Sequence, residues 1–211
     1  LLYLYPDKIT DELVAVIRDN DRVCKYVDLP IQHVNDTVLA RMNRHGDGAV
    51  VRAAVEKIRR EIPGVTLRTT AIVGFPGETE AQFAELCEFV KETGFDRFGA
   101  FTYSPEEGTP AAEFPDQIDE QVKQDRYDTL MAVQLEVSEK KMQEKIGDVI
   151  EVLCEGYDPV AGVQYGRSRA DAPDVDGKVY FTSAKKLPEG VFVNVKITKA
   201  LDYDLFGEAV R

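Results

Sequence analysis

The chain has 211 residues, of which 44% are apolar and 30% charged, and its formal net charge is −12. This composition is typical of a soluble globular chain with one large domain or two modest ones, and its strand-sized apolar runs exclude a transmembrane helix. The negative net charge argues against tight RNA or DNA binding. It is consistent either with an acidic surface that is simply solvated or with a basic protein partner.

The three cysteines, Cys24, Cys87 and Cys154, are isolated and lack the close spacing of metal ligands. Each is flanked by apolar residues, so the sequence predicts three buried thiols and no metal site. A sparse, odd number of cysteines without a signal peptide is typical of a reducing compartment, and predicts a cytoplasmic protein.

The first hundred residues alternate strands and helices in the manner of a parallel α/β fold. Strands are predicted at residues 1–5, 23–29, 65–73 and 95–103, and helices at 11–18, 36–44, 47–60 and 79–92. Near-continuous apolar strands favour a parallel sheet. The strand at residues 1–5 is an apolar, unprotected edge, so we expect a partial barrel whose other strands precede this chain.

The remainder of the chain changes character. A proline-rich ordered loop at 105–119 and a long helix at 120–145 lead into strands at 149–154, 163–168, 178–182, 191–200 and 205–209. Short strands punctuated by glycines favour a small closed barrel of the oligonucleotide/oligosaccharide-binding type. The predicted domains are therefore residues 1–143, with the trailing helix, and residues 144–211.

The carboxyl ends of the predicted strands are where an α/β fold places its function. The loop from Gly74 to Thr79 contains two glycines and a proline, which allow either close approach to a ligand or a simple tight turn. Arg68 lies in the preceding strand on the same face as Thr70, and needs an anionic partner from the protein or from a ligand. His33 also follows a strand; a surface position is favoured for it.

Three segments resemble the radical S-adenosylmethionine methylthiotransferases: LPIQH at 29–33, LRTTAIVGFPGET at 67–79 and YSPEEGTPA at 103–111. The resemblance covers essentially the whole chain. It implies about four of the six strands of a radical SAM (β/α) barrel, followed by a TRAM domain. It also implies S-adenosylmethionine and two 4Fe-4S clusters. The C-x-x-x-C-x-x-C loop of that family is absent, so we expect no cluster ligand and no catalytic residue here, and an inactive chain on its own.

The sequence is more similar to the RimO-type branch than to the tRNA-modifying, MiaB-like branch. Gln32 is followed by His33 and Val34, where the tRNA branch typically has Gln-Ser-Gly. The RimO-type branch adds a methylthio group to the β-carbon of an aspartate in small-subunit ribosomal protein twelve. Residues 144–211 hold 9 basic and 12 acidic residues, which suits a basic ribosomal protein better than tRNA. A tRNA methylthiotransferase and a substrate-binding module remain the alternatives.

The resemblance and the strand-end positions together imply five cofactor-binding residues. These are Gln32, Arg68, Ile72, Gly74 and Glu78. Ile72 is expected to pack near the adenine. Glu78 has an alternative role, because an acidic residue at the start of a helix can simply cap it.

A second hypothesis concerns the final domain. Three carboxylates, Asp171, Asp174 and Asp176, lie within six residues of an acidic domain. We expect them to contact the ribosomal protein electrostatically. The alternative is an exposed acidic turn without a partner.

Overall fold

The structure is a computed structural model that describes residues 1–210. It divides the chain into two compact units, Leu1–Gln134 and the residues from Leu135 onward. The division falls within the long helix α5 (Glu120–Gln143), whereas the sequence places the boundary after this helix.

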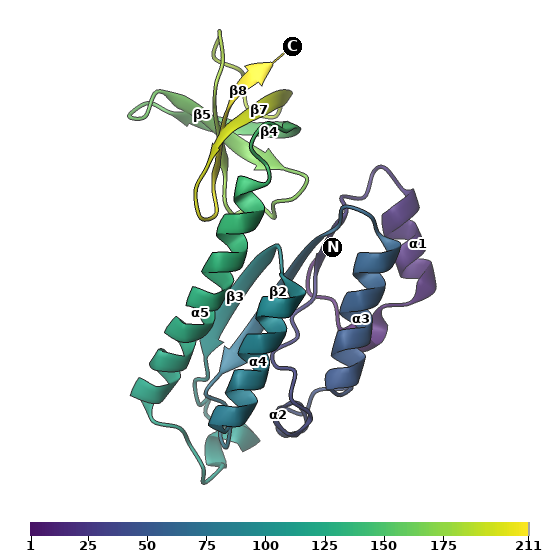
Figure 1. Cartoon of the computed structure of the whole chain (residues 1–211), viewed down its shortest axis with the longest axis vertical. Coiled ribbons are helices and arrows are strands. Elements are labelled where there is room, and N and C mark those ends of the chain that lie inside the picture. The colour runs from purple at the N-terminus through teal and green to yellow at the C-terminus, as the bar shows by residue number, and fades with distance from the viewer. Residues whose placement is uncertain (211) are drawn as a thin grey trace. The chain divides into compact units, whose positions relative to one another are not determined.

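The first unit alternates helices and strands along the chain (Figure 1). Before α5 it contains η1 (Pro6–Lys8), α1 (Asp11–Asp19), β1 (Tyr26–Asp28), α2 (Asp36–Arg41), α3 (Gly48–Glu61), β2 (Thr66–Val73), α4 (Glu80–Thr93), β3 (Arg97–Thr102) and η2 (Pro110–Glu113). The strands form a parallel sheet in the order β1-β2-β3. All four predicted helices form, and each is preceded by a side chain that accepts a hydrogen bond from its first turn: Thr10, Asn35, Asp47 and Thr79.

The strand predicted at residues 1–5 does not form. Leu4 still donates its backbone N–H to Asp28 across 3.0 Å, and the Leu1 carbonyl accepts from Asp28 across 3.0 Å. Tyr3 between them has a φ of 62°, which interrupts an extended backbone. Within residues 1–210 the partial barrel therefore has three regular strands, where the sequence predicts four.

The two faces of the sheet differ in burial. Along β2 the side chains alternate, with Leu67 and Val73 fully buried and Arg68 half-buried. The buried face packs against the helices, including Ile58 of α3 and Leu86 of α4 (Figure 1). The opposite face, which carries Arg68, is left to meet solvent or a ligand.

The second unit contains five strands after the end of α5. These are β4 (Val149–Asp158), β5 (Val163–Ser168), β6 (Val179–Thr182), β7 (Phe192–Ala200) and β8 (Leu205–Val210). They form a closed barrel in the order β4-β5-β6-β8-β7, in which only the β6–β8 pair is parallel. Val152, Cys154 and Val195 are completely buried in its interior. The predicted five-stranded closed barrel is confirmed.

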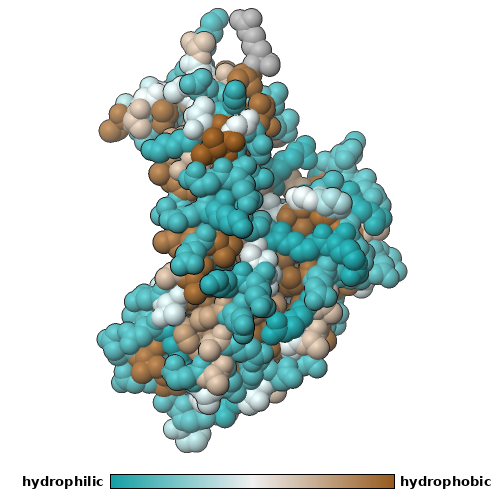
Figure 2. All heavy atoms as spheres, in the orientation of Figure 1, coloured by the Kyte–Doolittle hydropathy of each residue, from teal (hydrophilic) through white to brown (hydrophobic). Residues whose placement is uncertain are grey.

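Apolar side chains also remain at the surface of both units. Figure 2 shows them on one face as separate patches among hydrophilic residues. Phe101 of β3 is 62% exposed and Phe192 of β7 is 65% exposed. Within residues 1–210, no helix combines the length and the apolarity needed to cross a lipid bilayer.

Candidate functional site

The half-buried face of the sheet forms an open surface. We use the name open face for Arg68, Thr70 and Ile72 of β2 together with Gly99 and Phe101 of β3. Thr70 pairs in register with Gly99, and Ile72 with Phe101, so these side chains lie on one side of the sheet. A Cβ added to Gly99 would meet no atom within 4 Å. Within residues 1–210 the open face is therefore uncovered at Gly99.

Gln32 extends the line of β1 at the carboxyl end of the sheet. Its backbone N–H donates to Thr70 across 2.9 Å, and its carbonyl accepts from Ile72 across 2.8 Å. Its φ is 67°, and its side-chain Oε1 is buried without a hydrogen-bond partner within residues 1–210. An unpaired buried acceptor costs free energy, which a ligand donor would recover.

Arg68 has a carboxylate partner within the protein. Its Nη1 lies 3.3 Å from Oδ1 of Asp28 on the adjacent strand. The Asp28 side chain is fully buried, and its Oδ2 also accepts from the Tyr3 backbone across 3.1 Å. Asp28 is therefore the carboxylate partner of Arg68 within the protein, which the sequence did not identify. The Arg68 side chain remains 16% exposed.

The glycines of the β2–α4 loop are required by contacts within the protein. Gly74 has a φ of 73°, and a Cβ there would overlap the side chain of Lys123 from α5. A Cβ at Gly77 would overlap Asp116 and crowd Arg41. Tight packing therefore accounts for both glycines, although the backbone N–H of Gly74 still lies at the carboxyl end of the sheet.

Glu78 does not cap α4. Thr79 is the N-cap residue, and it forms a reciprocal capping box with Gln82. The Glu78 side chain is instead completely buried, and it accepts hydrogen bonds from the Gly74 backbone and, across 3.2 Å, from Arg126 of α5. Nothing in the sequence of α5 distinguishes Arg126 from the other charged residues of that helix.

His33 is also completely buried, so the surface position expected for it is wrong. Its Nδ1 accepts from the backbone N–H of Asn35 across 3.0 Å, and its Nε2 lies 3.4 Å from Glu78. Two polar partners compensate for its removal from water.

Ile72 packs beside a small apolar cluster at the carboxyl end of the sheet. The cluster consists of Val38, Phe75 and Tyr103. The Tyr103 hydroxyl is buried without a hydrogen-bond partner in the described part of the chain. Burial raises the pKa of the Tyr103 phenol, and the Glu106 carboxylate adds to this shift. Tyr103 is therefore a neutral phenol at physiological pH.

The acidic loop of the barrel unit uses two of its carboxylates internally. Asp171 is buried and accepts from the backbone and hydroxyl of Ser168, across 2.9 and 2.6 Å. Asp176 accepts from the backbone of Ala172 across 2.7 Å. Asp174 is exposed, with a φ of 62°. Of the three predicted substrate contacts, Asp174 is thus the one that faces solvent.

A cleft of about 420 Å³ lies beside this loop. Its lining includes Asp174 and Asp176 together with Arg167 and Lys178. The Nζ of Lys178 lies 4.5 Å from the ring centre of Tyr165, which also lines the cleft. The cleft is therefore of mixed charge rather than uniformly acidic.

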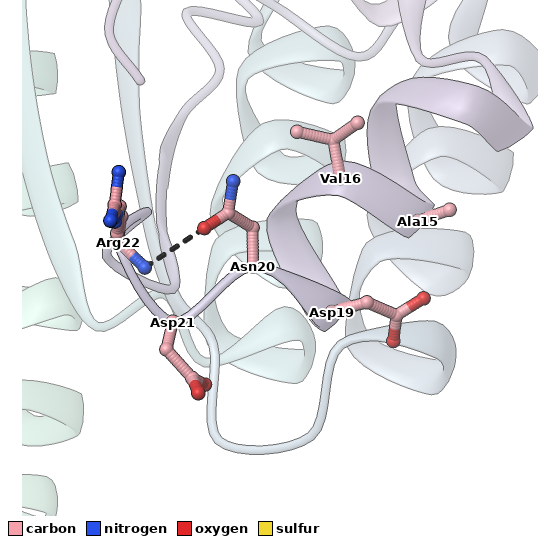
Figure 3. A pocket seen from close by; sticks show the side chains of 6 residues that line it. All are labelled: Ala15, Val16, Asp19, Asn20, Asp21 and Arg22. Carbon is pink, nitrogen blue, oxygen red and sulfur yellow. Dashed lines mark hydrogen bonds between the residues drawn. The ribbon is translucent and has the colours of Figure 1, made fainter.

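A second hollow, of about 630 Å³, lies at the end of α1 (Figure 3). It is lined by Ala15, Val16, Asp19, Asn20, Asp21 and Arg22. The side chain of Asn20 accepts from the Arg22 backbone across 3.0 Å and closes the turn. Because this turn leads into the amino end of β1, the hollow is not at the carboxyl ends where α/β folds place their ligands.

The three cysteines differ in burial. Cys154 is buried, Cys87 is half-buried and Cys24 is exposed, so the prediction of three buried thiols is correct for Cys154 alone. Burial, with a contribution from Glu78, raises the pKa of Cys87 to about 11. Residues 1–210 contain no group of three His, Cys, Asp or Glu side chains that could hold a metal ion.

Two family models match the chain, one in each unit. Residues 3–90 match the radical SAM superfamily, and residues 146–210 match the TRAM domain. The first match contains β1, β2 and Gln32, and the second contains the whole barrel. The open face thus lies in the radical SAM part, apart from its β3 residues.

Curated relatives match the chain from end to end. The chain is 51% identical over 208 residues to "Ribosomal protein uS12 methylthiotransferase RimO" of Alkaliphilus oremlandii, covering 98% of the chain and 48% of the relative. It is 52% identical over 211 residues to the protein of the same name from Geotalea uraniireducens, covering 100% and 47%. The chain therefore spans about half the length of these relatives.

A solved structure shows the same fold. Coproporphyrinogen III oxidase (HemN) of Escherichia coli, a radical SAM enzyme, is 23% identical and superimposes with a TM-score of 0.54. The match covers 64% of this chain and 31% of that one. At this identity the likeness concerns the fold alone.

Proposed function

Because the chain belongs to the RimO-type branch of the radical SAM family, we propose that it is part of an enzyme that methylthiolates an aspartate of ribosomal protein uS12. The observation that carries this proposal is the identity of about 50% to RimO proteins over the whole chain, across both units. The proposed role of the first unit is to form one wall of the cofactor pocket, and that of the barrel is to bind the substrate protein.

The open face fits part of an S-adenosylmethionine site. Within residues 1–210, Gln32 offers a buried acceptor without a hydrogen-bond partner, and no atom lies within 4 Å of a Cβ placed on Gly99. Ile72 and Phe101 supply an apolar surface suited to an adenine ring, while the partly accessible Arg68 suits a carboxylate. When bound, S-adenosylmethionine supplies the radical and the methyl group for this class of reaction. The contribution of these residues is to bind and orient it.

The described residues do not fit an iron-sulfur cluster. Cys24 lies in the loop before β1, Cys87 in α4 and Cys154 in β4, and residues 1–210 contain no group of three or more side chains that could hold a metal ion. We propose that the two 4Fe-4S clusters of the enzyme take their ligands from outside these 211 residues. The chain by itself is then a binding module without transferase activity.

The proposed substrate is a basic ribosomal protein in the cytoplasm, and tRNA is less favoured. The TRAM domain carries 9 basic and 12 acidic residues from position 144 onward, a balance that repels a phosphate backbone. The exposed Asp174 at the rim of the mixed-charge cleft is our proposed contact with a basic side chain.

Binding of the two candidate substrates tests this assignment. The 211-residue chain is titrated with purified uS12 and, separately, with a tRNA anticodon stem-loop at two salt concentrations. We expect salt-sensitive binding of uS12 that weakens in Asp174→Asn and is unchanged in Glu107→Gln, an exposed acidic residue of the first unit. Preferential binding of the stem-loop would favour the tRNA-modifying alternative.

A further inference from the structure

A cluster of three buried polar side chains lies at the carboxyl end of β2. Its centre is Glu78, which accepts from the Gly74 backbone and from Nη1 of Arg126. The third member is His33, whose Nε2 lies 3.4 Å from Oε1 of Glu78. Both Glu78 and His33 have completely buried side chains, and that of Arg126 is 7% exposed. Burying such groups is costly, so the cluster requires an explanation beyond apolar packing.

The hydrogen bonds of His33 determine which ring nitrogen carries the proton. The backbone N–H of Asn35 donates to Nδ1, so Nδ1 is an acceptor and the proton on Nε2 is directed at Glu78. Asn35 in turn caps α2 through its side-chain oxygen. The imidazole therefore ties the segment after Gln32 both to α2 and to the β2–α4 loop.

Gln32, the residue before His33, has a strained backbone. Its φ of 67° lies in the left-handed region, which residues other than glycine rarely adopt. Backbone hydrogen bonds with Thr70 and Ile72 fix Gln32 against β2. The next residue, His33, is fixed in turn by its contact with Glu78. Strain of this kind persists only where the surroundings impose it, and it is concentrated at functional sites.

We propose that His33, Glu78 and Arg126 are positioning residues that hold Gln32 and the Gly74 backbone in a preformed conformation for a nucleoside-type ligand. In this arrangement Oε1 of Gln32, which has no hydrogen-bond partner within residues 1–210, accepts a hydrogen bond from an N–H or O–H group of the ligand. The inference rests on the proposed function, which supplies S-adenosylmethionine as that ligand. A preformed site loses less conformational freedom when the ligand binds.

Arg126 is the member to test, because a matched control exists. Arg59 likewise pairs with a carboxylate, Asp96 at 2.6 Å, and it donates to the backbone carbonyls of Val65 and Gly94, near the amino ends of β2 and β3. Arg126→Met and Arg59→Met each remove a paired guanidinium but keep most of the apolar stem. Arg126→Lys retains the charge and tests for rescue.

The 211-residue chain is studied by NMR, with amide exchange and an S-adenosylmethionine titration as readouts. In the unmodified chain we expect the ligand to shift the amide resonances of Gln32 and Gly74. In Arg126→Met we expect exchange at these two amides to rise by roughly tenfold or more and ligand affinity to fall by roughly tenfold or more, because the variant loses the hydrogen bonds that Arg126 donates to Glu78 and Glu80. Arg126→Lys should recover part of both, and Arg59→Met should change neither.

Three outcomes would overturn the inference. The first is equal behaviour of Arg126→Met and Arg59→Met. The second is a uniform rise in exchange throughout the first unit, which would give Arg126 a merely structural role. The third is an absence of ligand-induced shifts at Gln32 and Gly74.

The imidazole of His33 provides an independent test. His33→Gln can still donate a hydrogen bond towards Glu78, whereas His33→Ala cannot. Only His33→Ala should therefore lose ligand affinity. Equal losses in the two variants would contradict the role of the Nε2 proton. A failure of the proposed function would be recognised separately from a failure of this inference, because the longer enzyme would then transfer no methylthio group to uS12. Ligand-induced shifts without transfer would leave the positioning cluster standing.

Discussion

Gly74 offers the most quantitative test of how the β2–α4 loop packs. We predict that Gly74→Ala destabilises the first unit by about 3 kcal/mol. An alanine at a φ of 73° costs about 1–2 kcal/mol in backbone strain. Its Cβ would also overlap the stem of Lys123, which is 1% exposed and cannot move without disturbing the core. Overpacking of this kind adds about 1–3 kcal/mol.

Gly64 provides the matched control. It has the same φ of 73°, but a Cβ there would meet no atom within 4 Å. Gly64→Ala should therefore cost only the backbone strain of about 1–2 kcal/mol. The assay is urea unfolding followed by circular dichroism in the far ultraviolet, because the chain has no tryptophan to serve as a fluorescent probe.

Lys123→Ala completes a double-mutant cycle. In Lys123→Ala the cost of Gly74→Ala should fall towards that of Gly64→Ala, because the closest contact, with Cγ of Lys123, is removed and only the Cβ of residue 123 remains, 3.1 Å away. Equal destabilisation by Gly74→Ala and Gly64→Ala in the chain with its native Lys123 would refute the predicted overpacking against Lys123. In that case the loop adjusts to a Cβ at position 74 and the close approach of α5 is not rigid.

Three further predictions concern single side chains. Asp28→Asn removes the carboxylate that pairs with Arg68, and should lower the free energy of unfolding by about 2 kcal/mol in urea titrations; an unchanged midpoint would contradict the pairing. Thr79→Ala removes the capping box of α4 and should cost about 1 kcal/mol in the same assay; no loss would mean that the cap is dispensable. The thiol of Cys87 has a pKa of about 11, above the reference value of 9.0, so stability from its protonated form is present below pH 9 and lost as the pH rises towards 11. Alkylation at pH 8 should accordingly modify the exposed Cys24 well before Cys87, and equal rates would refute this difference.

Local sequence signals predicted most of the regular elements. The helices begin at the capping residues that the sequence provides, and α4 begins after Thr79 as its capping box requires. The exception is residues 1–5, whose apolar composition is that of a strand. There the left-handed conformation of Tyr3 interrupts the extended backbone between Leu1 and Leu4, and no residue type in that segment signals it.

The candidate site was predictable only where it follows strand periodicity. Alternation along β2 placed Arg68 and Thr70 on the half-buried face. The partners of these residues come from distant parts of the chain, as Asp28 does for Arg68 and Arg126 for Glu78. A single sequence carries no signal for such tertiary contacts.

The partners of carboxylates in loops are equally hard to predict from the sequence. Asp171, Asp174 and Asp176 look alike in the sequence, yet two of them bond to their own loop and one faces solvent. The deciding factor is the conformation of the loop, which brings the backbone N–H of Ser168 to Asp171 and that of Ala172 to Asp176.

The most direct measurement is methylthio transfer by the longer enzyme that contains this chain. The enzyme is reconstituted anaerobically with iron and sulfide, supplied with S-adenosylmethionine and a reductant, and offered uS12 and tRNA in the same reaction. Mass spectrometry of both products then locates the methylthio group. We predict the modification on an aspartate of uS12 and none on tRNA. A modified tRNA with unmodified uS12 would contradict it.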